Sequence, residues 1–345
     1  MNAAPSSPPP RLHFIDELRG FAIAIVVLGH ALQYTLIAPD GNPVYRFIYS
    51  FHMPLFMFIS GFVYSGAKRG IGDEARLKSR TLLLPFLAWL PATFIWIQLG
   101  PAPLDPRAFI ARVVASPDAG GLWFLWVLFL INLMIILGRT LLPSRPLIAA
   151  SAFWVVLNAL VLARPQSNLL GIKLLCWHFP FFLAGLLFRR HNAARYLGPA
   201  VALACAVLFL LLEQNWSRTN TSAGMRGISV VVLRGFNYLT AFSAIFALYK
   251  LFSSVSMGPL KPALQYLGRV SLEIYATHIY FVAAAVFATG AGELSDATRV
   301  CIACLIGLTG ALVSTWAIKR WQPLALLMFG QIRPTHDSVT FVGRT

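Results

Sequence analysis

Long apolar runs recur along this chain of 345 residues, from Phe14 almost to the C-terminus. The runs are about 20 residues long, which is the length that a helix needs to cross the hydrocarbon core of a bilayer. Charged residues make up only 12% of the sequence and hydrophobic residues 58%, whereas a soluble domain carries about 25% charged residues. Water is therefore not the main solvent of this chain, and we predict an all-α integral membrane protein.

We predict about ten transmembrane helices that form one bundle without a soluble domain. The predicted spans cover residues 14–37, 45–65, 81–100, 122–142, 147–163, 169–188, 196–212, 227–252, 270–290 and 297–318. This divides the chain into an N-terminal tail (1–13), a membrane domain (14–320) and a C-terminal tail (321–345). The first ten residues lack the basic stretch that opens a signal peptide, so we interpret the first run as a retained helix.

Basic residues predict the orientation of the bundle. If the N-terminus is cytoplasmic, the cytoplasmic segments hold 19 of the 28 Lys and Arg residues. The positive-inside rule then favours both termini in the cytoplasm. The net charge of +16 comes from short clusters between apolar runs, so we expect no nucleic-acid partner.

Cysteines give no sign of a redox or metal site. Cys176, Cys205, Cys301 and Cys304 all lie inside apolar runs, and the last two form a CxxC with no histidine or carboxylate beside it. We interpret them as small packing residues. We therefore expect no metal and no tightly bound cofactor.

The predicted first helix carries ionisable residues, which membrane spans normally exclude because each costs about 2.5 to 3.5 kcal/mol at the bilayer centre. Asp16 and Arg19 lie near its cytoplasmic end, and His30 follows eleven residues after Arg19. Eleven residues make three turns plus about 20° and advance about 16 Å, so Arg19 and His30 share one face. With this spacing, Arg19 could bind an anionic donor at the membrane surface while the reactive group of the donor reaches His30 near the bilayer midplane. A snorkelling arginine and a core histidine are the structural alternative.

Further polar residues are predicted at midplane depth. His52, His178 and His278 all lie well inside apolar spans. In the ninth span Ser271, Tyr275 and His278 stand at i, i+4 and i+7, so they form one polar stripe that faces a cavity or protein rather than lipid. No carboxylate or cysteine completes a metal-ligand set, and we interpret the imidazoles as groups for acid/base chemistry and hydroxyl binding.

Five sequence blocks occur in a recognisable order. They are an Asp, LRG and His in the first span, then FHMPLFMFISGF, GLWFLWVLF, PFFLAGLLF and LGRVSLEIYATH. From about Phe14 to His278 the chain thus resembles the membrane acyltransferase family 3, particularly its fucose 4-O-acetylase-like and exopolysaccharide O-acetyltransferase subgroup. The resemblance implies a multi-pass enzyme of the bacterial inner membrane. Its members move an acyl group, usually acetyl, from cytoplasmic acyl-CoA to a hydroxyl of a surface or secreted glycan.

The resemblance also implies roles for individual residues. His30 matches the family's essential histidine, and Arg19 its signature arginine. The family has an Arg-x-x-Arg stretch at the start of the third helix, where this chain has RLKSR. We therefore expect Arg76, Lys78 and Arg80, together with Arg19, to bind the phosphates of acyl-CoA. Phosphate binding depends more on several cationic donors lying close together than on one exact sequence spacing between them. The alternative is that this basic cluster only determines the membrane topology of the chain.

Other residues are candidates for acceptor binding or support. Asp16 could orient Arg19, and Trp123 could stack on a sugar ring, although an aromatic belt commonly explains such a Trp. The remaining candidates are His52, Ser271, Tyr275 and His278. The expected partners are acyl-CoA, a glycan acceptor with lipid-linked forms among the candidates, membrane lipid and polysaccharide assembly proteins.

Two mechanisms and two rival classes of function stay open at this point. His30 could act as general base on the acceptor hydroxyl, or it could form an acyl-histidine intermediate. The main rival is a polytopic transporter or flippase of a glycan-related substrate, in which buried His and Arg would bind substrate or couple protons. Against the transporter, the two halves of the sequence show no corresponding pair of spans that Gly or Pro interrupts. A structural scaffold would leave the midplane histidines unexplained.

Overall fold

The structure is a computed structural model that describes residues 12–66, 69–100, 103–117, 121–164, 168–217, 228–290 and 294–331. The predicted tails therefore lie outside the described residues, except for their inner ends. So does Lys68, one of the basic residues in the segments predicted to be cytoplasmic.

Regular structure in the described part of the chain is helical. Besides four short 3-10 helices, η1(Pro39–Gly41), η5(Leu169–Gly171), η6(Ala193–Tyr196) and η7(Gly258–Leu260), the described residues form α1(His13–Thr35), α2(Pro43–Tyr49), α3(His52–Phe62), α4(Ile71–Lys78), the π-helical η3(Ser79–Leu83), α5(Leu84–Gln98), α6(Pro106–Ala115), α7(Trp123–Leu141), α8(Pro146–Ala163), α9(Ile172–Arg190), α10(Pro199–Glu213), α11(Ile228–Ser254), α12(Lys261–Arg269), α13(Ser271–Thr289), α14(Asp296–Arg320) and α15(Gln322–Phe329).

Seven helices of the described part are long and apolar enough to cross a bilayer. They are Ile71–Gln98, Trp123–Leu141, Pro146–Ala163, Leu169–Arg190, Ser229–Ser254, Ser271–Thr289 and Asp296–Arg320. The integral membrane class is thus supported, but the predicted count of ten spans is not confirmed.

The three other predicted spans correspond to α1, to α2 with α3, and to α10. The predicted second span is broken at Ser50 and Phe51 into helices of 7 and 11 residues, and α10 has 15 residues. Each of these pieces is shorter than the roughly 20 residues that a straight span needs. The third span also differs from the prediction. Its helix begins at Ile71, so the basic residues of RLKSR lie on a helix and not in a loop.

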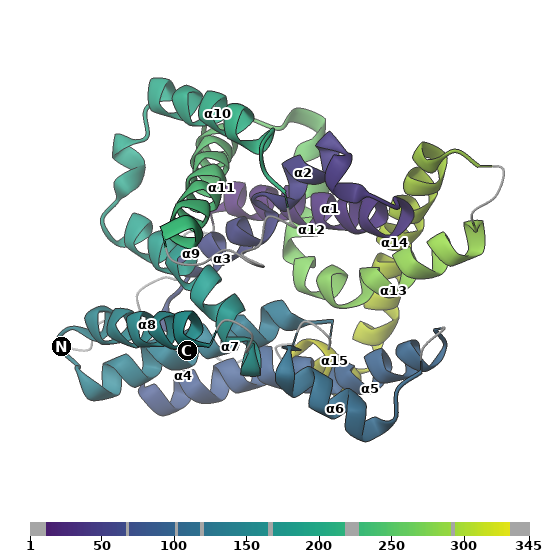
Figure 1. The fold of residues 1–345 in the computed structure, drawn as a ribbon, viewed down its shortest axis with the longest axis horizontal. Helices are drawn as coiled ribbons and strands as arrows, with labels where there is room; N and C mark the ends of the chain where they lie inside the picture. Colours follow the sequence, from purple (N-terminus) through teal and green to yellow (C-terminus); the bar gives the residue numbers. More distant parts are fainter. Residues whose placement is uncertain are drawn as a thin grey trace, which may run out of the picture.

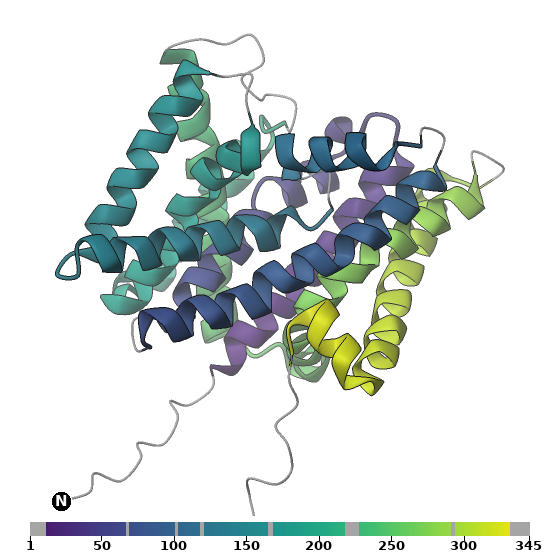
Figure 2. The ribbon, with the colours of Figure 1, turned by 90° about the horizontal axis from the view of Figure 1, so that it is seen from below.

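Helix α1 runs through the middle of the bundle (Figure 1), where it packs against α12, α13, α14, α11, α2 and α3. Its apolar residues Leu18, Ala22 and Ile23 are completely buried. In Figure 2 the first turns of α1 lie at the same end of the bundle as α15, and α6 lies at the opposite end. Arg19 and His30 therefore follow one another along the central helix, from that end inward.

Glycines allow α1 and α12 to cross closely. A Cβ on Gly20 would lie 1.9 Å from the carbonyl oxygen of Leu264, and a Cβ on Gly268 would lie 1.9 Å from that of Asp16. Neither position can hold a side chain without moving a backbone. Small residues commonly serve this purpose where membrane helices meet.

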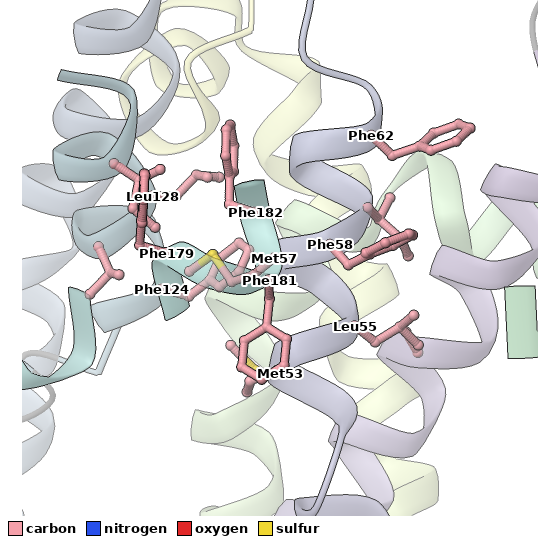
Figure 3. Packing of buried hydrophobic residues seen from close by; sticks show 14 of the residues in the cluster. Met53, Leu55, Met57, Phe58, Phe62, Phe124, Leu128, Phe179, Phe181 and Phe182 are labelled. Carbon is pink, nitrogen blue, oxygen red and sulfur yellow. The ribbon is translucent and has the colours of Figure 1, made fainter. Parts of the chain in front are cut away.

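A second close crossing joins α3 and α9 inside the aromatic core. Gly61 faces the backbone of Phe182 across this crossing, and Gly185 faces that of Phe58. Figure 3 shows the surrounding side chains, which come from α3 (Met53, Leu55, Met57, Phe58, Phe62), α7 (Phe124, Leu128) and α9 (Phe179, Phe181, Phe182). This core fixes α3 against α9 and so fixes the position of the break before His52.

Gly185→Ala should lower the thermal stability of the purified protein. The new Cβ would lie 2.0 Å from the carbonyl oxygen of Phe58, and forcing extra methyl groups into a packed core typically costs about 1 to 3 kcal/mol. The measurement is thermal unfolding in detergent. Gly235→Ala on α11 is the matched control, because no atom lies within 4 Å of its new Cβ. Equal melting temperatures for the two variants would contradict the close crossing.

Candidate active site

A cavity of about 220 Å³ opens between α1, α3, α7, α12 and α13. Its lining residues are Arg19, Met53, Phe56, Ser60, Phe124, Gly268, Arg269, Ser271, Leu272 and Tyr275. The lining includes two arginines and two hydroxyl-bearing predicted site residues, but no carboxylate. Such a lining favours an anionic ligand with an apolar portion.

The crossing of α1 and α12 brings the two arginines to one cavity. Arg19 precedes Gly20, and Arg269 follows Gly268, so each arginine is next to a glycine of the closest backbone approach. Arg19 is half-buried and Arg269 is exposed. Arg269 was not among the predicted site residues, because its partner across the cavity lies 250 positions earlier in the chain.

A helix break builds the other wall of the cavity. Val270 separates α12 from α13, so Arg269 ends one helix and Ser271 begins the next. The first backbone N–H groups of a helix have no partner within the helix and carry partial positive charge. The cavity thus lies at the start of α13 and is lined by two guanidinium groups.

His30 lies deeper along α1 and is held by two polar neighbours. Its Nδ1 is 3.0 Å from Oε1 of Gln33 and 3.3 Å from the hydroxyl of Tyr49. The Tyr49 hydroxyl also donates to Oε1 of Gln33. With the amide in this orientation, Nδ1 of His30 donates to an oxygen that only accepts, which leaves the lone pair of the neutral ring on Nε2.

Three further histidines have the same tautomer. In His52, His178 and His278, Nδ1 lies 2.8 Å from the carbonyl oxygen of the residue four positions earlier. A carbonyl oxygen only accepts, so Nδ1 carries the hydrogen and Nε2 is the acceptor in each neutral ring. All four imidazoles therefore present a basic nitrogen away from their own helix backbone.

His30 and His278 lie side by side. Their ring centroids are 5.2 Å apart. His278 is 1% exposed, and its Nε2 has no hydrogen-bond partner within the described part of the chain. Tyr275, which lines the cavity, is one turn before His278, with ring centroids 6.3 Å apart. The predicted polar stripe thus connects the cavity to the pair of histidines.

The other candidate acceptor or supporting residues do not all lie around this pair. The His52 ring contacts the ring of Tyr49 at a centroid distance of 4.7 Å. Trp123 packs against His178 at 4.9 Å. Asp16 is buried, and its carbonyl oxygen faces Gly268.

The predicted basic cluster does not line the cavity. Arg76 is exposed on α4, and the ammonium group of Lys78 lies 5.5 Å from the centre of the Tyr64 ring. Arg80 lies in the π-helical segment η3, with its carbonyl oxygen against Gly330. Such π-helical turns often occur at functional sites. Of the four residues expected to bind the donor, only Arg19 lines the cavity.

A buried ion pair, which the sequence analysis missed, holds the segment that carries this cluster. Arg139 donates to the carboxylate of Glu74 and to the carbonyl oxygens of Gly66 and Arg69. Glu74 also accepts a hydrogen bond of 2.5 Å from the hydroxyl of Tyr64. Because Glu74 is completely buried, these contacts fix the start of α4 against α7.

A second buried carboxylate, Glu273, was also missed. It lies in the first turn of α13, forms an ion pair with Lys319 and accepts a hydrogen bond of 2.8 Å from Gln331. A glutamate inside the apolar run LEIYATH was a readable signal, because acidic residues in membrane spans have partners or a function. Gln33 stands three residues after His30 on the same helix, which was also a readable signal, whereas the contact of Tyr49 with His30 is tertiary and could be found only from the structure.

Comparisons with known proteins agree with the sequence blocks. The family model described as "Acyltransferase domain" matches residues 12–316. Nodulation protein NolL of Mesorhizobium japonicum is 32% identical over 187 residues, which are 50% of this chain and 46% of that protein. Nodulation protein NolL of Sinorhizobium fredii is 34% identical over 192 residues, 50% of this chain and 47% of that protein. The chain spans about half the length of the curated relatives it matches, and no solved structure matches it.

Proposed function

The chain belongs to the acyltransferase family of that domain model, and from this premise we propose that it is a membrane O-acyltransferase that moves an acyl group from cytoplasmic acyl-CoA to a sugar hydroxyl. Acetyl is the proposed acyl group. The acceptor is an exopolysaccharide or another surface glycan precursor. The proposed location is the bacterial inner membrane, with both termini in the cytoplasm.

One observation carries this proposal. His278 lies one turn after Tyr275, which lines a cavity together with two arginines, and His30 lies beside His278. Cationic groups at one end suit the phosphates of a CoA ester, and basic nitrogens at the other end suit deprotonation of a hydroxyl. Arg19 and His30 on one helix set the distance between the two ends.

The donor would enter from the cytoplasmic end of α1. Its anionic groups would bind Arg19, with the cluster of Arg76, Lys78 and Arg80 on the nucleotide portion. The pantetheine arm would then extend along the cavity and carry the thioester towards His30. A cavity of mixed polar and apolar lining fits a chain of amides and methylenes.

His30 would act as the general base. In this reaction Nε2 takes the proton of the acceptor hydroxyl, the hydroxyl oxygen bonds to the acyl carbon, and the carbon–sulfur bond breaks. The proton then passes to the departing thiolate of CoA. Gln33 and Tyr49 keep Nδ1 of His30 as the donor, which holds the ring in the tautomer that this step needs.

The transporter reading finds some new support in the two helix breaks, at Ser50–Phe51 and at Val270, because broken helices often line transport sites. Family membership and the paired histidines weigh against it. An acyltransferase and a transporter also differ in whether CoA is released from acetyl-CoA.

The test of the proposal is transfer of label by the purified protein. Protein in detergent or nanodiscs is incubated with labelled acetyl-CoA and a candidate lipid-linked oligosaccharide, and the glycan is analysed by mass spectrometry. The expected result is acetylated glycan with release of free CoA. Movement of unmodified glycan across the membrane of a proteoliposome, with no CoA release, would instead make the protein a transporter.

Neutralising the basic cluster tests how the donor is bound. The triple variant Arg76→Gln, Lys78→Gln, Arg80→Gln should raise KM for acyl-CoA about ten-fold or more, because each charge-assisted contact contributes about 1.5 to 3 kcal/mol. It should change kcat and the KM for glycan little, since such contacts are made equally in ground and transition states. Initial rates are measured against acyl-CoA concentration at fixed acceptor.

The insertion of this triple variant is checked first with reporter fusions after residue 70, because the same charges determine topology. An unchanged KM for acyl-CoA in a correctly inserted protein would contradict the role of the cluster. The phosphate site would then be assigned to Arg19 and Arg269 alone.

A further inference from the structure

The imidazole of His278 has an unused acceptor in the centre of the bundle. Its Nδ1 donates to the carbonyl oxygen of Ile274, so Nε2 can only accept. This nitrogen is buried and has no partner within the described residues. Buried polar atoms are nearly always satisfied, and one that is not calls for an explanation such as a ligand.

The ligand of His278 must bring a hydrogen-bond donor to a place beside His30. The ring centroids of the two histidines are 5.2 Å apart. Both rings present an Nε2 that accepts, and a single hydroxyl has only one hydrogen to donate. The hydroxyl that gives its proton to His30 therefore cannot also satisfy His278, which needs a second hydroxyl close to the first.

We propose that His278 binds the hydroxyl adjacent to the one that is acylated, so that the acceptor is a vicinal diol of a sugar ring. This inference rests on the proposed function. Hydrogen bonds of about 2.8 Å from two neighbouring sugar oxygens can span two imidazoles at the observed separation. His278 is then a specificity residue, whereas His30 takes part in the bond changes.

The step at the diol balances without a further reactant. The reacting hydroxyl loses its proton to Nε2 of His30, its oxygen forms the new ester bond, and the thiolate of CoA leaves and receives the proton. The neighbouring hydroxyl keeps its hydrogen and donates it to Nε2 of His278 throughout. His278 stays neutral and holds the sugar so that one of two similar hydroxyls faces the thioester.

The experiment compares acceptors that differ by one hydroxyl. The purified full-length protein is given labelled acetyl-CoA and the methyl pyranosides of glucose, galactose and mannose. For each sugar that is acetylated, the derivative with a hydrogen in place of the neighbouring hydroxyl is then tested, and kcat/KM is measured for both. We expect the diol to be preferred about 100-fold or more, because a buried acceptor is left unpaired by the deoxy sugar.

Three variants test whether His278 causes this preference. His278→Phe keeps a ring but removes the acceptor, and the ratio of kcat/KM for diol over deoxy sugar should fall to about one. His278→Gln places an amide oxygen near the position of Nε2 and should restore part of the ratio. His178→Phe is the matched control, because His178 is equally buried and has the same carbonyl contact but lies against Trp123. Whatever its overall rate, it should keep the wild-type ratio.

The outcomes separate this inference from the proposed function. A wild-type ratio near one, a ratio that survives His278→Phe, or acetylation only at the primary hydroxyl, which has no neighbouring hydroxyl, would overturn the role of His278. If the wild-type protein neither acetylates a sugar nor releases CoA from acetyl-CoA, the proposed function itself fails. Loss of protein in His278→Phe is detected by size-exclusion chromatography, in which case His278→Gln carries the comparison.

Discussion

His30→Ala is expected to abolish acyl transfer in a protein that still inserts into the membrane. A positioned general base contributes about 10² to 10⁴-fold in rate, and alanine leaves no base on α1 near His278. Replacing an interior polar residue by alanine also makes a helix easier to insert. The measurement is transfer of label from acetyl-CoA to glycan at saturating donor, normalised to the amount of folded protein.

His13→Ala is the matched control for this variant. His13 begins the same helix but is exposed, so its loss should leave the rate unchanged. Near-normal transfer by His30→Ala would remove His30 from the mechanism. Trapping of a labelled acyl-enzyme in the wild-type protein, absent in His30→Ala, would favour the acyl-histidine route over direct transfer.

The sequence predicted the class of this fold because length and hydrophobicity alone determine whether a helix can cross a bilayer. It failed at the break between α2 and α3, where only Ser50 and His52 interrupt the apolar run. A signal was available at Pro54, which lies at the third position of α3. Proline has no N–H and is tolerated in the first turn, where the N–H groups have no helical partner. It therefore indicated a helix start near Phe51.

The predicted polar stripe of α13 is present because a period of 3.6 residues depends only on the local helix. Ser271 and Tyr275 line the cavity, and His278 faces His30. The contact that brings Arg269 to the same cavity could not be predicted in the same way. It depends on the crossing of α12 and α1 at Gly268 and Gly20, a contact between segments about 250 residues apart.

Arg19→Ala should lower kcat/KM for acyl-CoA about 100-fold or more. A guanidinium group that binds a phosphate through two parallel N–H···O contacts loses both, and each charge-assisted contact contributes about 1.5 to 3 kcal/mol. Arg19→Lys should recover only part of this loss, because an ammonium group keeps the charge but not the fork. Arg234→Ala is the control, since Arg234 contacts Asn158 away from the cavity.

The double variant of Arg19 and Arg269 decides whether the two arginines bind one anion. Both arginines line the same cavity, so removing either one should weaken the binding of a shared phosphate. Removing the second arginine from a single variant should then lower kcat/KM for acyl-CoA by a smaller factor than removing it from the wild-type protein. The fold-loss of kcat/KM in the double variant would then be smaller than the product of the two single fold-losses, as is found for groups that share a partner. Effects that multiply without coupling would mean that the arginines act on separate groups of the donor. Full recovery of donor affinity by Arg19→Lys would show that charge alone suffices, and would remove the bidentate contact from the proposed binding mode.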